Sequence, residues 1–536
     1  MNVHELALIS LISPIAFTVT AIVSWFQPGM RPEFMKGLST LTTLVGLLVA
    51  FVCSYLVLQH GLLESSFIGL KQLGFSIRLD SLSVLMLTMI ALIGFIVVKF
   101  SLNYLDGDSR QGAFIGRLAA TIASVQLLVV SGNLGLLFVS WVLTSVSLHR
   151  LLMFYSERPG AIVVARKKFV VARLGDACLL GAVVVLYNVF NTGNLEMIFE
   201  SIKVSIVSGI KIENIEYAAI FIVLTALLKS AQFPSHGWLI EVMETPTPVS
   251  ALLHAGLLNA GPFLIVRMAY IMEVSSFSSY ILIVIGGFTA LFASVVFLTQ
   301  TSIKTALGYS SVAHMGFSLL VCGLGLYPAA MLHLVAHSFY KAHAFLSSGS
   351  LIEVIRASSI TSIKRNGNPF RIAIGIALAL FVYVCFAWLW GIDINSQLAL
   401  LSIGAIIVMG LASLFVTALD SNGGYKLVMK ASGLAIIVAA AFFTLESGMH
   451  YLLHNGLPKV HILRVGEVVL ISIITVIFST IVFVQLLKPV LSSPSFFRFI
   501  AIHLRNGLYV NALFDRLVGA LDVQKSKNNV KVINHQ

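Results

Sequence analysis

The chain has 536 residues, of which 58% are hydrophobic and 10% are charged, and its mean hydropathy is +0.97. Soluble domains carry about 25% charged residues, so this composition excludes a soluble globular protein and indicates a polytopic membrane protein. The net charge of +12 does not indicate nucleic-acid binding, because the basic residues collect in loops that are predicted to share one membrane face.

Apolar runs long enough to span a bilayer recur about fifteen times, which predicts an all-α polytopic fold. They lie at 6–26, 38–59, 81–100, 115–131, 134–154, 169–190, 216–243, 248–272, 278–299, 304–324, 326–353, 371–391, 396–419, 431–449 and 465–487. Three polar or amphipathic stretches lie outside these runs. We expect a short external hairpin or loop at 60–80, an external amphipathic segment at 191–215, and a helix on the cytoplasmic membrane surface at 488–525.

The basic residues predict the direction in which the chain crosses the membrane. If the N-terminus is outside, the connections after odd-numbered runs lie inside, and these hold basic residues such as Arg31, Lys36, Arg166, Lys167 and Lys168. Membrane proteins carry their excess of Lys and Arg on the cytoplasmic side. The sequence therefore predicts a multi-pass protein of the cell inner membrane, with its N-terminus outside and its C-terminus in the cytoplasm.

The stretch FIVLTALLKSAQFPSHGWLIEVMETPTPVSALLH places an amine, Lys229, inside an apolar run. An ammonium at bilayer depth costs about 2.5–3.5 kcal/mol on insertion scales. Pro234 follows shortly after and predicts a helix break just past the lysine. Further titratable residues come next, namely Glu241, Glu244 and His254. This combination predicts a site that moves ions or protons.

Three other polar residues within or beside the predicted spans have two interpretations each. Asp176 lies three residues after Arg173 on one helix face, and this pair either anchors a helix end or admits protons. Lys304 opens its span and is either an interfacial lysine or part of an ion path. His314 is either a packing residue or an auxiliary group of that path.

The run 326–353 carries His333, His337 and Lys341 at i, i+4 and i+8, which is one stripe on an α-helix. Successive groups lie about 6 Å apart along the axis, and histidine titrates near neutral pH, so the stripe predicts a proton relay. Structural polar packing is one alternative. Zinc binding is another, but no carboxylate or thiolate lies beside the histidines and a cation follows one turn on, so we expect no metal site.

Several sequence blocks resemble a known family. KSAQFP, METPTPVSALLHAG, SIKTALGYSSVAHMGF and HLVAHSFYKAHAFLSSGS are similar to the antiporter-like, proton-translocating subunits of respiratory complex I and of Mrp-type cation/proton antiporters. VVARLGD, FSIRLDSLS and the C-terminal GLYVNALFDRL also match that family's pattern. The resemblance covers roughly 75–520 and implies two inverted five-helix repeats, each with one broken helix.

The resemblance also implies residue roles and a division of the chain. In that family the matching residues line a hydrated polar axis at the bilayer midplane; here they are Lys229, His254, Lys304, His333, His337 and Lys341. We add Asp176 to this predicted path, and the auxiliary candidates are His149, Glu241, Glu244 and His314. The expected parts are N-terminal helices with the hairpin, two repeats, C-terminal helices and a tail, at 1–110, 111–275, 276–420, 421–487 and 488–536.

Two charges of the family pattern are missing. The family usually has a glutamate directly after a tryptophan as partner of the broken-helix lysine, but Val142 follows Trp141 here. His149 lies two turns further on, on roughly the same face. The family also usually has a lysine or glutamate in its second broken helix, and 372–391 has neither. Each predicted repeat therefore lacks one member of its charge pair, which puts complete proton pumping in doubt.

A compact, divergent member without these charges resembles the membrane subunit of DAB-type inorganic-carbon accumulation complexes. That resemblance implies a transporter subunit without catalysis of its own or a cofactor in this chain. It implies a large cytoplasmic partner that binds zinc, resembles carbonic anhydrase and hydrates CO2 when protons or another cation pass through this chain. Two alternatives stay open: a subunit of a complex I-like or Mrp-type assembly, and a membrane scaffold whose polar axis has decayed.

Overall fold

The computed structural model describes residues 3–70, 72–242, 245–348, 367–391, 398–421, 424–458, 463–487 and 494–517. Helices dominate, because a chain in lipid must satisfy its backbone hydrogen bonds within each segment. Thirteen helices among these residues are long and apolar enough to cross a membrane. The predicted all-α polytopic fold is therefore confirmed, whereas the number fifteen and the two inverted repeats stay predictions.

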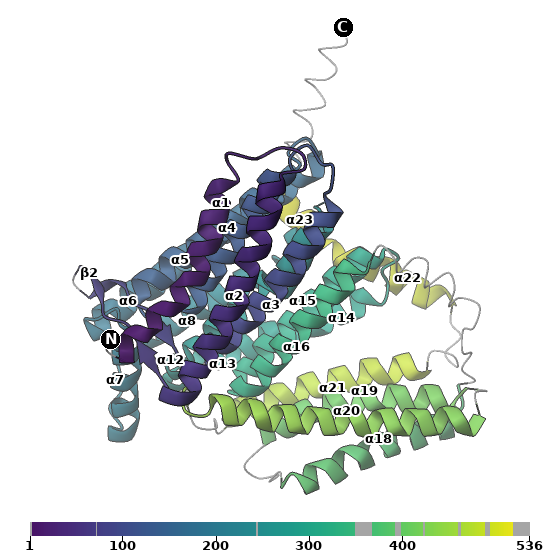
Figure 1. Ribbon diagram of the computed structural model, residues 1–536. Coiled ribbons are helices and arrows are strands. Elements are labelled where there is room, and N and C mark those ends of the chain that lie inside the picture. Colours follow the sequence, from purple (N-terminus) through teal and green to yellow (C-terminus); the bar gives the residue numbers. More distant parts are fainter. Residues whose placement is uncertain are drawn as a thin grey trace.

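The chain begins with a bundle of long helices (Figure 1). Its members are η1 (Val3–Leu11), α1 (Ile12–Val23), α2 (Glu33–His60), α3 (Ser81–Tyr104), α4 (Gln111–Val129), α5 (Leu134–Leu152) and α6 (Pro159–Phe190). Asp80 and Asn133 cap α3 and α5, each accepting a bond from a backbone N–H of the first turn.

Short strands connect α2 to α3. β1 (Leu63–Glu64) pairs antiparallel with β4 (Arg78–Leu79), and β2 (Ile68–Leu70) pairs with β3 (Leu73–Phe75). The hairpin expected at 60–80 is thus confirmed, and α7 (Leu195–Ser208) occupies the expected amphipathic segment. In Figure 1 the N-terminus, β2 and α7 share one end of the bundle.

The middle of the chain is built from shorter helices around the predicted break. They are α8 (Ile215–Lys229), α9 (Gly237–Glu241), α10 (Thr247–Ala255), η3 (Leu257–Asn259), α11 (Ala260–Arg267) and α12 (Ala269–Val274). The stretch from α10 to α11 is wholly buried, and α10 packs against both α3 and α16. This stretch is therefore the centre of the bundle.

The second half of the chain returns to longer helices. They are α13 (Phe277–Ile281), a π-helical turn η4 (Leu282–Gly286), α14 (Gly287–Phe297), α15 (Ile303–Gly323), α16 (Tyr327–Leu346), α18 (Pro369–Leu389), α19 (Leu398–Leu419), α20 (Gly424–Leu453) and α21 (Val465–Leu487). α18 runs without interruption from Pro369 to Leu389, so the break that the resemblance implies for the second repeat does not fall within this helix, and a second broken helix stays a prediction. Pro369 is the first residue of α18, where the missing N–H of a proline costs nothing. The rest of the helix contains no proline.

The last four long helices, α18 to α21, form a layer beside α14 to α16 (Figure 1). α20 contacts α16, and α21 contacts α14. The C-terminal helices α22 (Pro494–Arg505) and α23 (Val510–Leu517), joined by η6 (Gly507–Tyr509), lie at the opposite end of the bundle from the N-terminus.

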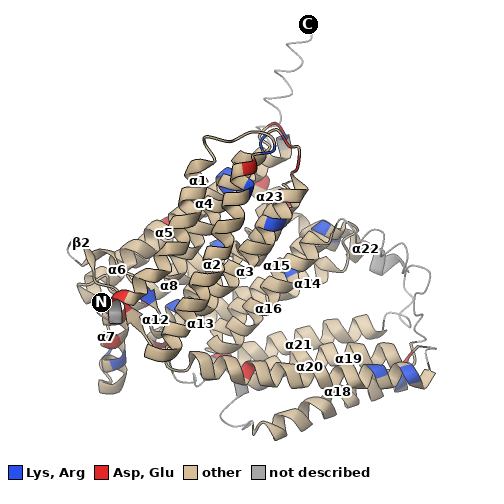
Figure 2. Cartoon of the chain, in the orientation of Figure 1, with Lys and Arg blue, Asp and Glu red and all other residues tan. Residues whose placement is uncertain are grey.

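Lys and Arg gather at the end of the bundle that also carries α22 and α23 (Figure 2). Basic residues lie at the ends of the helices around α1, α4 and α23, and others lie at one end of α14 and α15 and at one end of α20. The positive-inside rule predicts that this basic end faces the cytoplasm. Which face is cytoplasmic stays a prediction.

A compact network of opposite charges lies at the other end. Asp80 accepts from Arg78 Nε at 2.8 Å and from Arg267 Nη1 at 2.5 Å. Arg78 also pairs with Glu196 of α7. The side chains of Arg78 and Arg267 are buried. The network therefore joins β4, the start of α3, α7 and α11.

Candidate ion-translocation site

α8 ends at Lys229, and the chain stays non-helical until α9 begins at Gly237. Ala231 adopts a left-handed φ of 51°, and Pro234 has no N–H to continue a helix. The break predicted past the lysine is confirmed. A cation at the C-terminal end of a helix is favoured, because the free carbonyls there carry partial negative charge.

Lys229 is held by helix α5, which carries no carboxylate (residues 134–152). Its Nζ donates to Thr144 Oγ1 at 3.0 Å and to Ser145 Oγ at 2.8 Å. The same Nζ lies 4.6 Å from the centroid of the Trp141 ring, within cation–π range. Two hydroxyls and an aromatic face thus surround the amine, beside the Val142 position where the family usually has glutamate.

A second buried lysine shares this site, and sequence reasoning missed it. Lys168 Nζ donates to the Ser145 carbonyl at 2.5 Å, so Ser145 binds Lys168 through its backbone and Lys229 through its side chain. In the sequence, Lys168 stands among the basic residues of a predicted inner loop. The signal that could have found it is its spacing of eight residues from Asp176, which puts both on one helix face.

Asp176 lies near both lysines. Arg173 Nη2 contacts Asp176 Oδ2 at 2.5 Å, and the carboxylate interacts electrostatically with Lys229 and Lys168. The predicted Arg173–Asp176 pair is therefore present. Asp176 can both anchor the helix end and take part in proton entry. Arg173 forms an ion pair with the carboxylate, and the same carboxylate interacts electrostatically with Lys229 and Lys168.

Short polar contacts connect this site to the second half of the chain. Ser230 Oγ donates to the Leu258 carbonyl at 3.3 Å. Asn259, the next residue, donates through Nδ2 to Ser338 Oγ at 2.7 Å. Ser338 follows His337 on α16. These two hydrogen bonds, which we call the polar thread, therefore lie between the break beside Lys229 and the predicted relay helix.

The relay stripe on α16 faces α10 and α15. Lys341 is fully buried, and its Nζ donates to the Leu307 carbonyl at 3.1 Å. His254 of α10 stacks on Phe345 with ring centroids 4.3 Å apart. His254 lies close enough to Lys341 and to His337 for the charges of these groups to act on one another. Three predicted groups from two sequence blocks, namely His254, His337 and Lys341, therefore come together.

His314 joins this cluster directly. Its Nδ1 lies 3.3 Å from His333 Nε2, and its ring centroid is 5.0 Å from that of His337. A cavity of about 590 Å3 borders His314 and His333 and is otherwise lined mainly by apolar residues of α14, α15, α16, α19, α20 and α21. His314 thus belongs to the cluster rather than to apolar packing alone. No group of three or more His, Cys, Asp or Glu side chains in the described ranges is arranged to hold a metal ion.

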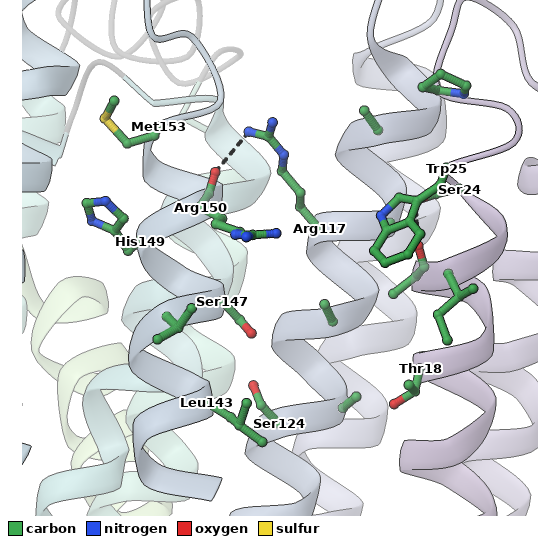
Figure 3. Close-up of a pocket in the computed structure, with 18 of the residues that line it drawn as sticks. Thr18, Ser24, Trp25, Arg117, Ser124, Leu143, Ser147, His149, Arg150 and Met153 are labelled. Atoms are coloured by element: carbon green, nitrogen blue, oxygen red, sulfur yellow. Dashed lines mark hydrogen bonds between the residues drawn. The ribbon is translucent and has the colours of Figure 1, made fainter. Parts of the chain in front are cut away.

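One of the remaining predicted residues lies apart from these contacts. Lys304 is partly buried in the first turn of α15, and no described residue joins it to Lys341 by a hydrogen bond. His149 borders a groove between α1, α4 and α5, but it projects from the side of α5 opposite Arg150 (Figure 3). There its ring centroid lies 5.6 Å from that of Phe169 on α6, and it interacts electrostatically with Lys168 and Arg173 at the edge of the Lys229 site. Glu244 lies outside the described residues.

Glu241 connects the broken helix to the C-terminal segment. Its Oε2 accepts from Lys167 Nζ at 2.5 Å, and its Oε1 accepts from Asn511 Nδ2 at 2.6 Å. Lys167 also pairs with Asp515 of α23. The sequence predicts only a surface helix for this tail, but α23 binds both Glu241 of α9 and Lys167 of α6. Lys167 directly precedes Lys168, the lysine that donates to the Ser145 carbonyl.

Replacing Ser145 with Ala is expected to destabilise the protein by about 1–2 kcal/mol, because Lys229 loses its shorter hydroxyl bond while Thr144 remains. Ser147→Ala is the matched control, since this serine lines the groove on the same helix and no hydrogen bond to Lys229 involves it. Thermal denaturation in detergent measures both. Equal effects of the two substitutions would contradict the assignment.

Replacing Asn511 with Ala is expected to speed backbone hydrogen exchange across Gly237–Glu241 about tenfold, because a five-residue helix depends on its clamps. Asn506→Ala is the control, since Asn506 donates only within its own segment, to the Ile502 carbonyl at 2.9 Å. Mass spectrometry of the exchanged full chain reads the peptide directly. Unchanged exchange in Asn511→Ala would show that α23 does not hold α9.

The fold and this site define a class: a polytopic membrane protein with buried lysines and histidines joined across the bundle. Two family models match the sequence. "NADH:quinone oxidoreductase/Mrp antiporter, TM" matches residues 131–392, and "NADH-Ubiquinone oxidoreductase (complex I), chain 5 N-terminus" matches residues 67–115.

Curated relatives agree with these models. The probable inorganic carbon transporter subunit DabB2 of Halothiobacillus neapolitanus is 36% identical over 453 residues, covering 84% of this chain and 81% of the relative. The probable inorganic carbon transporter subunit DabB of Hydrogenovibrio crunogenus is 41% identical over 278 residues, covering 52% of this chain and 53% of the relative. NADH-quinone oxidoreductase subunit L of Mycobacterium tuberculosis is 32% identical over 316 residues, covering 58% of this chain and 49% of the relative.

Solved structures share the fold. A chain of the Mrp complex from Dietzia sp. aligns with a TM-score of 0.58 at 20% identity, covering 97% of this chain and 60% of that chain. A chain of an archaeal membrane-bound sulfane sulfur reductase aligns with a TM-score of 0.56 at 18% identity, covering 95% and 99%. The chain belongs to the antiporter-like family of NADH:quinone oxidoreductase and Mrp membrane subunits, and it resembles the inorganic carbon transporter subunits of that family.

Proposed function

We propose that this chain is the membrane subunit of an energy-coupled inorganic carbon pump. It conducts protons or another cation, and the flow drives a large cytoplasmic partner that binds zinc and resembles carbonic anhydrase. The observation that carries this proposal is the 36% identity to a probable inorganic carbon transporter subunit over most of both chains. The inner membrane, with the N-terminus outside, is the proposed location.

The proposed path begins where Asp176, Lys168 and Lys229 meet. It follows the polar thread through Ser230 and Asn259 to the cluster around Lys341. The ring nitrogens of His254 and His337 have no hydrogen-bond partner among the described residues, and buried polar groups need one. Internal water between these imidazoles is the partner that we expect, and it lets protons pass along the stripe.

Hydration of CO2 belongs to the partner in this proposal. The chain contributes the ion path, and its end that carries α22 and α23 contributes a docking face. α23 reaches Lys167 and Glu241, so docking there acts on the helix that follows the break. The zinc is expected in the partner, and this chain takes part in no step of the hydration itself.

Expressing this chain with and without the partner gene in a host that lacks carbonic anhydrase tests the proposal. Growth in air is expected only when both are present, because the gradient and the hydration are supplied by different chains. Growth supported by either chain alone contradicts a coupled pair. A catalytically inactive partner, lacking a zinc ligand, is the matched control for mere assembly.

A second function is favoured by one observation, the match to NADH:quinone oxidoreductase and Mrp subunits. In that case the chain conducts protons in a redox-driven pump or a cation/proton antiporter. The neighbouring reading frames separate the two functions. Genes for quinone-reductase or other Mrp subunits favour the second, and a large soluble protein with Cys, Asp and His ligands for zinc favours the first.

A further inference from the structure

A groove of about 710 Å3 runs between α1, α4 and α5. Its lining on α4 is made of small residues, among them Gly116, Ala120 and Ala123. Ile22 and Leu143 add apolar walls from α1 and α5. Figure 3 shows the groove with these three helices side by side.

Two arginines stand at one end of this groove. Arg117 Nη1 donates to the Arg150 carbonyl at 2.9 Å, and the Arg150 side chain extends toward α4 in Figure 3. Neither guanidinium has an ion-pair partner within the described part of the chain, whereas nearby Arg110 pairs with Glu157 at 2.8 Å. Trp25, 74% exposed, lies beside them, as tryptophan does at membrane interfaces.

We propose that this groove binds an anionic phospholipid. The phosphate lies between the guanidiniums of Arg117 and Arg150, which match phosphate geometry, and one acyl chain follows α4. From Arg117 to Leu127 the helix rises about 15 Å, which is half of a hydrocarbon core about 30 Å thick. The groove therefore has the length of one leaflet, with its charge at the interface.

Charge complementarity favours a lipid over a helix of a neighbouring subunit. Basic pockets between transmembrane helices on the cytoplasmic side bind anionic headgroups, and the arginines lie at the end that the basic loops predict to be cytoplasmic. A neighbouring helix would have to bring carboxylates into the interface to meet both arginines. A lipid brings the anion and the apolar chain together.

Native mass spectrometry of the full-length chain, purified with its accompanying subunits, tests the site with phosphatidylglycerol and phosphatidylcholine. Wild-type protein is expected to retain phosphatidylglycerol about tenfold better than the zwitterionic lipid. Arg117→Gln with Arg150→Gln abolishes this preference. Arg371→Gln is the matched control, since Arg371 likewise donates Nη1 to a carbonyl, that of Leu419, at 3.3 Å, and it keeps the preference.

A second variant tests the groove separately from its charge. Ala120→Phe fills the groove and leaves both arginines, so phosphatidylglycerol retention is expected to fall as well. Retention that survives Ala120→Phe but is displaced by inorganic phosphate overturns the lipid assignment in favour of a simple anion site. Loss of an accompanying subunit from Ala120→Phe, with lipid retention unchanged, overturns it in favour of a protein helix.

Discussion

Replacing Lys341 with Met is expected to lower carbon uptake about a hundredfold, because proton transfer by a positioned side chain contributes about 10²–10⁴-fold in rate. Lys341 is fully buried and is the amine that the structure places beside His254 and His337. Methionine keeps a similar length and removes only the charge and its bond to the Leu307 carbonyl. Uptake of labelled bicarbonate by cells that express the chain with its partner measures the effect.

Lys99→Met is the control for this substitution, since Lys99 is an exposed lysine of α3. The folded state of Lys341→Met is expected to be at least as stable as wild type, because an apolar side chain replaces a buried charge. Thermal denaturation therefore separates transport from folding. Uptake at wild-type levels in Lys341→Met supports the scaffold alternative, in which the polar groups no longer act.

Replacing Asp80 with Asn is expected to destabilise the protein by about 3–5 kcal/mol, because it removes the only carboxylate that is hydrogen-bonded to the buried Arg267 guanidinium in the described residues. Arg267 keeps only neutral acceptors, Ser83 Oγ at 2.6 Å and the Val129 carbonyl at 3.3 Å. Asp106→Asn removes an exposed pair with Lys36 and is expected to leave the denaturation midpoint unchanged. Equal stability of both variants would contradict the structural role of the network.

The same carboxylate gives the stability a defined pH dependence. Burial alone would raise the pKa of Asp80, but the Arg267 and Arg78 charges outweigh it and hold that pKa well below its ordinary value of 3.8. The folded protein therefore binds this proton less readily than the unfolded chain. The stabilisation is fully present above about pH 4 and is lost as the pH falls below it. In Asp80→Asn this acid-dependent loss is expected to be absent.

Local patterns predicted the parts of the site that lie within one helix or one turn. Pro234 marked the break after Lys229 because its ring cannot continue a helix. The i, i+4, i+8 spacing placed His333, His337 and Lys341 on one stripe, since 3.6 residues make a turn. The confirmed hairpin between α2 and α3 followed from a stretch too polar to cross.

Contacts between distant segments could not be predicted in the same way. Lys167 and Lys168 look alike in the sequence, yet one meets Asp515 of the tail and the other meets Ser145. Which of two neighbouring lysines faces which helix depends on how α6 is rotated against α5 and α23. The link from Asn259 to Ser338 likewise depends on the packing of α16 beside η3.

The absence of a carboxylate from α5 (residues 134–152) is the departure from the family pattern with the clearest structural answer. Thr144 and Ser145 accept from the amine where the family usually has a glutamate after the tryptophan. Hydroxyls hold a protonated amine without neutralising it.

Ion flux through proteoliposomes that hold the purified assembly tests the central claim most directly. With an imposed pH gradient and a trapped pH dye, or a sodium gradient and a sodium dye, wild-type protein is expected to dissipate the gradient. Lys229→Met and Lys341→Met are each expected to slow this flux at least about tenfold, and Lys99→Met is expected to match wild type. Equal flux in all four proteins would show that no ion uses these buried lysines.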